Sequence, residues 1–277
     1  MERLDNSIQR VWKTEQEILD VIDSVCRENG LCYSLMYGTL LGAVRHHGFI
    51  PWDDDIDLIM PREDYNRLIK IWDQVSPDNY ILQNKDTNAD YPNSFLKIRK
   101  LHTTFLQGEN ERVKTYQKGI FVDIFPADRF APTKLLKKVQ FSACLLNMLL
   151  TRDYSSGDGG LVELVERIIL LLPKDLKEKL RLRTERYIQK WNDNKENPYL
   201  VPVTVQSCRR VYPPDMFVDL NRGLFQGKSY PIIKDYDSVL KTVFGDYMTL
   251  PPESERTWKH HPIILDFEHD LEELEHE

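Results

Sequence analysis

The chain has 277 residues, 41% of them apolar, and can therefore bury a sizeable core as one large domain or as two that share an interface. With 37 Lys and Arg against 44 Asp and Glu, the net charge is −7, which argues against a surface that coats nucleic acid. We therefore expect a globular protein with no nucleic-acid partner.

The N-terminal part alternates helical and extended patterns. Apolar residues recur every three or four positions from Ile8 to Cys26, and Asn29-Gly30 supplies a stop, which predicts an amphipathic helix. LCYSLMYG then predicts a short strand that runs into a turn at Gly38-Thr39, and LLGAVRHHG predicts a helix that ends at Gly48.

The pattern continues with a second strand and a second amphipathic helix. IDLIM predicts the strand, Pro61 stops it, and REDYNRLIKIWDQV has one apolar helical face. We expect further strands at YILQN, FLKIRK, TTFLQG and GIFVDIF. The first half is thus predicted to be a mixed sheet with flanking helices, in an α+β fold.

After Phe130 the chain becomes mainly helical in pattern. VQFSACLLNMLL and LVELVERIILLLP are strongly apolar, DYSSGDGG between them has loop composition, and DLKEKLRLRTERYIQKW has helical character. Short extended pieces around NPYLVPV and GKSYPII and a helix in YDSVLKTVFGDYM follow. We therefore place one part, built on the mixed sheet, at residues 1–130 and a mainly helical part at residues 131–277.

Cysteine usage and hydropathy indicate a cytoplasmic protein. The four cysteines are scattered without zinc-ligand spacing, which is typical of reduced thiols: Cys26, Cys32, Cys144 and Cys208. MERLDNSIQRVWKTEQ lacks the apolar core of a signal peptide, and no apolar stretch is long enough to span a bilayer. KKVQFSACLLNMLL and LVELVERIILLLPK carry lysines at their edges; we favour a helical core for them, and peripheral contact at the inner face of the membrane is the alternative.

Four aspartates crowd into five positions in WDDDID, at Asp53, Asp54, Asp55 and Asp57. In a strand, residues two apart point to one face with Cα atoms roughly 6.5 to 7 Å apart, so the carboxylates of Asp55 and Asp57 would lie side by side. Such a pair calls for Mg²⁺ or Mn²⁺, which use a few carboxylates and leave positions open for phosphates. A solvated acidic turn is the alternative. A calcium loop is excluded because Leu58 stands where glycine is required.

Two further features fit a phosphate beside a metal. A helix that begins just after Gly38-Thr39 would aim backbone N–H groups and a hydroxyl at an anion, although such a turn can also merely cap the helix. Asp123 in GIFVDIF can supply a third carboxylate, or it can be a hydrogen-bonded aspartate at a strand end. Together these residues form a layout suited to phosphoryl transfer.

These residues carry a family resemblance. GTLLG, RHHGFIPW, DDDID and MPREDY resemble the hallmark of the LicD family of phosphotransferases, which includes the fukutin-related proteins. The resemblance extends to GIFVDIFPAD and to YDSVLKTVFGDYMTLPP with the residues that follow, so it covers most of the chain. It implies a nucleotidyltransferase-like fold, in which Gly38, Thr39, Asp55, Asp57 and Asp123 hold the metal and the phosphates. The extra pair Asp53 and Asp54 leaves open which acids touch the metal.

The resemblance also implies a reaction: transfer of a substituted phosphate, best known as phosphocholine, from a CDP-linked donor to a sugar hydroxyl. The acceptor would be a cell-surface glycan such as teichoic acid or lipopolysaccharide, or a lipid-linked precursor. Asp123 could accept the proton of the hydroxyl. Basic side chains are candidates for phosphate contacts or ordinary surface residues: Arg45, Lys97, Arg99, Arg256, His260 and His261. Trp52 and Tyr37 could line a choline site by cation–π contact or belong to the core.

Two other functions remain open from the sequence. A nucleotidyltransferase would use the same metal and carboxylates but release pyrophosphate instead of CMP. A catalytically silent binding protein would keep the fold and lose part of the pattern, yet every element of the pattern is present. Release of CMP or of pyrophosphate therefore distinguishes a phosphotransferase from a nucleotidyltransferase.

Overall fold

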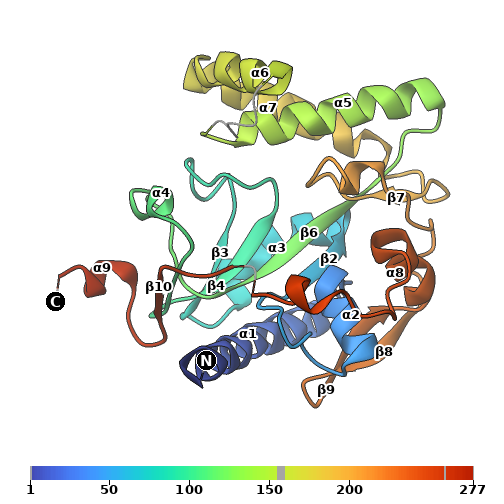
Figure 1. Ribbon diagram of the computed structural model, residues 1–277. Helices are drawn as coiled ribbons and strands as arrows, with labels where there is room; N and C mark the ends of the chain where they lie inside the picture. The colour runs from blue at the N-terminus through green and yellow to red at the C-terminus, as the bar shows by residue number, and fades with distance from the viewer. Residues whose placement is uncertain (1, 155–159, 259, 277) are drawn as a thin grey trace.

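The computed structural model describes residues 2–154, 160–258 and 260–276. Its centre is a six-stranded mixed sheet, with helices around it and a second group of helices to one side (Figure 1). The fold is α+β, as the sequence predicts. Along the sheet the strands are β1 (Ser34–Leu35), β2 (Asp57–Pro61), β6 (Phe121–Arg129), β4 (Leu96–Lys100) and β3 (Tyr80–Gln83), and β7 (Tyr199–Leu200) pairs with the end of β6.

The two central strands, β2 and β6, run parallel, and their neighbours pair with them in antiparallel fashion. Parallel strands at the centre of a sheet are buried on both faces, which explains the continuous apolar run Leu58, Ile59 and Met60. The parallel pairing brings residue 57 level with residue 123. The two acidic segments predicted from the sequence therefore meet at one end of the sheet.

The helices of the first half are α1 (Glu2–Glu28), α2 (Tyr37–Arg45), α3 (Arg62–Val75) and the short α4 (Glu109–Arg112). α3 begins directly after Pro61, which confirms the predicted boundary. The predicted start of α2 is wrong, because the prediction began the helix at Leu40 whereas α2 begins at Tyr37. The N–H of Leu40 already bonds to the carbonyl of Met36. Gly38 and Thr39 consequently lie in the first turn of the helix and not before it.

In the second half, α5 (Lys134–Thr151), α6 (Gly160–Leu170) and α7 (Lys174–Ile188) form the predicted helical group, and α8 (Tyr236–Phe244) follows later. Most of the predicted loop DYSSGDGG lies outside the described residues. The sequence analysis missed β8 (Leu220–Phe225), which forms a hairpin with β9 (Lys228–Ile233). β10 (Ile264–Asp266) pairs with β5 (Thr104–Leu106), and α9 (Leu271–Leu274) comes last. Among the described helices, none is both long and apolar enough to cross a bilayer.

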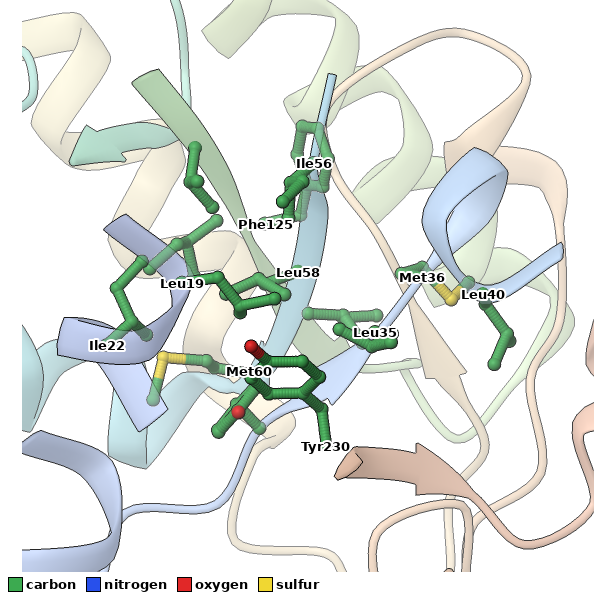
Figure 2. Packing of buried hydrophobic residues seen from close by; sticks show 14 of the residues in the cluster. Leu19, Ile22, Leu35, Met36, Leu40, Ile56, Leu58, Met60, Phe125 and Tyr230 are labelled. Atoms are coloured by element: carbon green, nitrogen blue, oxygen red, sulfur yellow. The ribbon is translucent and has the colours of Figure 1, made fainter. Parts of the chain in front are cut away.

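The main hydrophobic core crosses the boundary that we placed at residue 130. Leu19 and Ile22 of α1 gather with Leu58 and Met60 of β2 and with Tyr230 of the hairpin (Figure 2). A smaller cluster lies beneath α5 and includes Cys144 and Met148. The division into two parts stays a prediction, but β8, β9 and α8 share the core of the first part. All four cysteines are free thiols, as expected.

Candidate active site

Three charged side chains form a row across neighbouring strands. Asp57 on β2 is the register partner of Asp123 on β6, and Asp123 is the partner of Lys97 on β4. The ammonium of Lys97 lies 2.5 Å from Asp123 Oδ1 and 3.3 Å from the centre of the Phe121 ring. Lys97 and Asp123 are both buried. The row thus places two carboxylates and one ammonium in a space from which water is largely excluded.

Burial makes the carboxylates costly to ionise. It raises the pKa of Asp57 well above its ordinary value, and the charges of Asp55 and Asp123 raise it further. Burial likewise raises the pKa of Asp55 to about 7, with Asp53 adding to the effect and His260 opposing it. The raised pKa values mean that Asp55 and Asp57 are favoured in their protonated form, or in an ionised form whose charge a bound cation balances.

Glu15 of α1 is a further acid that the sequence analysis missed. It is only 1% exposed, and burial, followed by the charges of Asp55, Asp54 and Asp123, raises its pKa well above the ordinary value. Its Oε2 atom has no hydrogen-bond partner. The signal was present in the sequence, because position 15 lies on the apolar face of the helix, between Val11 and Ile18.

The strand that carries Asp57 is shorter than the sequence suggests, since β2 begins at Asp57 and Asp55 precedes it. Asp54 and Asp53 are engaged with other parts of the chain. The carboxylate of Asp54 accepts hydrogen bonds from the indole N–H of Trp258 and from the backbone N–H of His260, and it lies 3.1 Å from His260 Nδ1. Asp54 thereby holds the C-terminal segment over the site. The carbonyl of Asp53 accepts a bond from the indole of Trp12, at 2.7 Å.

The first turn of α2 adjoins the acids. Thr39 is buried, and its hydroxyl oxygen accepts a 2.8 Å hydrogen bond from the backbone N–H of Asp57. This oxygen therefore fixes the start of β2, a role that the sequence analysis did not foresee. At Gly38 a Cβ atom would lie 2.3 Å from Asp53 Oδ2, so any larger residue would displace the carboxylate of Asp53. The backbone N–H groups of this turn precede the first intrahelical bond and can face an anion.

A cavity of about 280 Å³ opens beside the row. Asp123, Lys97 and His260 contribute to its wall. Arg99 also lines it, although this guanidinium is occupied by bonds to Gln83 Oε1 and to the carbonyl of Gly119, at 2.6 and 2.5 Å. Aromatic rings complete the lining: Tyr91, Phe95, Tyr116, Phe121 and Tyr154. The wall therefore offers both charged and aromatic groups.

His260 stands between the acids and this cavity. Its Nδ1 atom is 3.9 Å from a carboxylate oxygen of Asp55, and the ligand atoms of Asp54, Asp55 and His260 lie within 4.8 Å of one another. Burial lowers the pKa of His260, but the bond to Asp54 and the charge of Asp55 outweigh it and hold the pKa above its ordinary value. His260 thus carries a positive charge more readily than a free imidazole.

The remaining candidates from the sequence lie elsewhere in the structure. The guanidinium of Arg45, in the last turn of α2, donates to the carbonyl of Tyr247 at 2.6 Å. Arg256 lies 5.4 Å from the ring centre of Trp52 and donates to the carbonyl of Pro251. His261 is exposed and packs against Trp258. None of Arg45, Trp52, Arg256 and His261, all of which are described, lines the cavity beside Asp123.

The donor set suits a hard divalent cation. Asp55, Asp57 and Asp123 offer only carboxylate oxygens, which Mg²⁺ and Mn²⁺ prefer. The raised pKa values of Asp55 and Asp57 and the unpartnered oxygen of Glu15 all reflect uncompensated negative charge. The chemistry of these acids therefore suits the metal that the family resemblance implies, although the ligand atoms that lie within 4.8 Å of one another at this site belong to Asp54, Asp55 and His260.

Comparison with known proteins agrees with this geometry. Residues 30–141 match the family model described as LicD/FKTN/FKRP, nucleotidyltransferase domain. This part of the chain is similar to the LicD family. The resemblance inferred from the sequence motifs is confirmed. The matched residues include Gly38, Asp57, Lys97 and Asp123, whereas His260 lies outside them.

Three curated relatives resemble the chain. The lipopolysaccharide cholinephosphotransferase LicD of Haemophilus influenzae is 28% identical over 253 residues, which cover 88% of this chain and 92% of that protein. The uncharacterized protein RP689 of Rickettsia prowazekii is 28% identical over 141 residues, covering 44% of this chain and 50% of its own length. RT0683 of Rickettsia typhi, also uncharacterized, is 31% identical over 137 residues, 49% of this chain and 39% of its own.

The bond between Thr39 and Asp57 leads to a first prediction. Thr39→Val nearly keeps the shape of the side chain but leaves the buried N–H of Asp57 without an acceptor, so the free energy of unfolding should fall by about 1 to 3 kcal/mol. Turnover should fall as well, because Asp57 loses its fixed position. Urea unfolding measures the change in the free energy of unfolding, and the rate of CMP formation measures the change in turnover. Thr39→Ser keeps the oxygen and is the control; equal losses in both variants would contradict the assigned role.

Proposed function

We propose that the protein transfers phosphocholine from CDP-choline to a sugar hydroxyl of a cell-surface glycan, or of its lipid-linked precursor. The observation that carries the proposal is the row of Asp57, Asp123 and Lys97 beside the first turn of α2, with a cavity of about 280 Å³ at its side. Carboxylates for a cation next to backbone amides for an anion suit a diphosphate substrate.

The comparison supports the choice of transferred group and of acceptor. The Haemophilus influenzae relative is named for cholinephosphate transfer to lipopolysaccharide, and it aligns along 88% of this chain. The rings of Phe95 and Tyr154 lie in the cavity wall and are not buried, and a quaternary ammonium group prefers aromatic faces. Of the aromatic residues suggested by the sequence, Trp52 is engaged with Arg256 and Tyr37 packs against Phe125.

The proposed site holds Mg²⁺ or Mn²⁺ on Asp55 and Asp57, with Asp123 as the third carboxylate. When bound, the metal neutralises the charge of the diphosphate and makes CMP a better leaving group. His260, with its raised pKa and its place in the cavity wall, can donate a hydrogen bond to a phosphate oxygen. The ammonium of Lys97 lies 2.5 Å from Asp123 Oδ1 and fixes the position of this carboxylate.

In the proposed step, the oxygen of the sugar hydroxyl forms a bond to the phosphorus of phosphocholine. The bond from this phosphorus to the bridging oxygen of the diphosphate breaks, and CMP leaves with the electron pair. The proton of the hydroxyl passes to the carboxylate of Asp123. Asp123 is placed for this role because it is buried and lies at the edge of the cavity.

The test is to incubate the purified protein with Mg²⁺, CDP-choline and a panel of glycans, including lipopolysaccharide. We expect CMP and choline-labelled glycan in equal amounts. EDTA should stop the reaction, Mg²⁺ or Mn²⁺ should restore it, and Zn²⁺ should be a poor substitute because the proposed ligands are all oxygen atoms.

The products also separate the competing functions. Pyrophosphate released from a nucleoside triphosphate would point to a nucleotidyltransferase. Binding of CDP-choline without turnover of any glycan would point to a silent binding protein of this fold. Activity that survives exhaustive chelation would contradict the metal-dependent site.

A further inference from the structure

The exposed apolar side chains of the protein are concentrated on α5, α6 and α7. Eleven of the 21 large apolar side chains that are exposed among the described residues lie between Leu135 and Leu182. Leu135 is 71% exposed and Leu171, just after α6, is 85% exposed. In Figure 1 the three helices lie together on one side of the molecule, with α1 and the β8–β9 hairpin on the other.

α6 presents an apolar face that the other described residues leave uncovered. Leu164, Val165, Ile168 and Leu171 follow each other at helical spacing, and all four are exposed. The helix turns Ile169 toward the interior. An apolar stripe of this length on a surface helix is expected to have a partner.

α5 and α7 add a groove of the same character. It encloses about 590 Å³ and includes Val139, Leu146 and Leu180 in its wall. Arg183 and Arg186 of α7 also line it, and both are exposed. The groove therefore combines an apolar floor with basic side chains at its edge.

The charge of this helical group is opposite to that of the rest of the chain. Residues 134–188 contain eleven Lys and Arg against seven Asp and Glu, a net charge of +4, whereas the whole chain has −7 and the remaining residues thus carry −11. The basic residues include Lys134 and Lys138 at the start of α5 and Lys174 and Lys179 on α7, all exposed. Because only this helical group is positively charged, an anionic surface would attract the protein by this group and repel the rest of it.

We propose that α5, α6 and α7 dock the protein on an anionic lipid bilayer. Ten of the eleven exposed apolar residues are leucine, isoleucine or valine and the eleventh is Tyr154, and bilayer interfaces accept such side chains beside lysine and arginine. Protein interfaces, in contrast, concentrate tryptophan and tyrosine and use leucine and valine less. Docking would bring the protein to the surface where a lipid-linked or membrane-embedded acceptor is presented, and this last point alone rests on the proposed function.

The test is flotation of the full chain with vesicles of phosphatidylcholine and with vesicles of phosphatidylglycerol and phosphatidylcholine in equal parts. The protein should float with the anionic vesicles only, and salt should weaken the binding. The triple variant Leu164→Ser, Ile168→Ser, Leu171→Ser should bind at least about tenfold more weakly, since burial of one leucine is already worth about tenfold. A control triple variant alters exposed apolar residues elsewhere, Val113→Ser, Val218→Ser and Met248→Ser, and should bind as the parent does.

Two further measurements make the result decisive. Thermal unfolding should be unchanged in the triple variant, because the three side chains are exposed. Its CMP release with a water-soluble acceptor should equal that of the parent, so failure of docking and failure of the proposed reaction are separable. Absent binding of the parent to anionic vesicles, or equal binding of the triple variant, would overturn the proposal. A parent dimer that the triple variant converts to a monomer would overturn it too, by assigning the face to a second copy.

Discussion

Asp57→Asn is expected to lower turnover by at least about a hundredfold while the fold stays intact. Asparagine keeps the shape of the side chain but removes the carboxylate at the end of the row, next to Asp123. Asp55→Asn should act in the same way. CMP release and circular dichroism measure activity and fold, and Asp73→Asn, on the exposed side of α3, is the matched control. Near-normal turnover in either variant would remove that residue from the site.

The same variants should differ from the parent in the pH dependence of stability. The pKa of Asp55 is raised to about 7 in the folded protein, so its contribution is fully present below the unfolded value of about 3.9 and is lost as the pH rises to 7. The raised pKa of His260 acts in the same direction. In the presence of a chelator, the melting temperature of the parent should therefore fall across this range. That of Asp55→Asn should fall less, and an equal fall would contradict the burial of uncompensated charge.

Lys97→Met is expected to lower the free energy of unfolding by about 3 kcal/mol or more, and to abolish turnover. Lys97 and Asp123 form a buried ion pair, and removal of the cation leaves the carboxylate without compensation beside Asp57. Urea unfolding and CMP release give the two values.

The double variant Lys97→Met, Asp123→Asn provides the control for this prediction. It removes both charges, so most of the lost stability should return while turnover stays absent. If the double variant is as unstable as Lys97→Met, the loss comes from packing of the lysine stem against Phe121 and not from an unpaired charge.

Local chemistry made part of the fold predictable. Pro61 and the spacing of Tyr65, Leu68 and Trp72 were sufficient to locate α3, because a helix boundary and an amphipathic face are written in neighbouring residues. The hairpin of β8 and β9 was harder to predict, since its turn depends on a left-handed backbone at Gln226 as well as at Gly227. A residue other than glycine or asparagine gives little warning of such a turn.

The candidate site was predictable only where it depends on sequence motifs. Asp55, Asp57 and Asp123 stood out through their density and their place beside apolar strands. The pairing of Asp123 with Lys97 required the order of the strands, which no local pattern contains. Glu15 was overlooked because a single acidic residue in the middle of an amphipathic helix does not by itself indicate that its side chain is buried beside other acids. The bonds of Asp54 to Trp258 and His260 join residues more than 200 positions apart, beyond the reach of any local rule.

That long connection has a consequence for the synthesis of the protein. Trp258 and His260 leave the ribosome long after Asp54, so Asp54 is synthesised before the two residues that donate hydrogen bonds to its carboxylate. During this interval the acidic segment is open to solvent on the side that the later segment will cover. The site can therefore become competent only when translation has passed residue 260, and a messenger cut short before that point would yield a protein with most of its core and an unfinished centre.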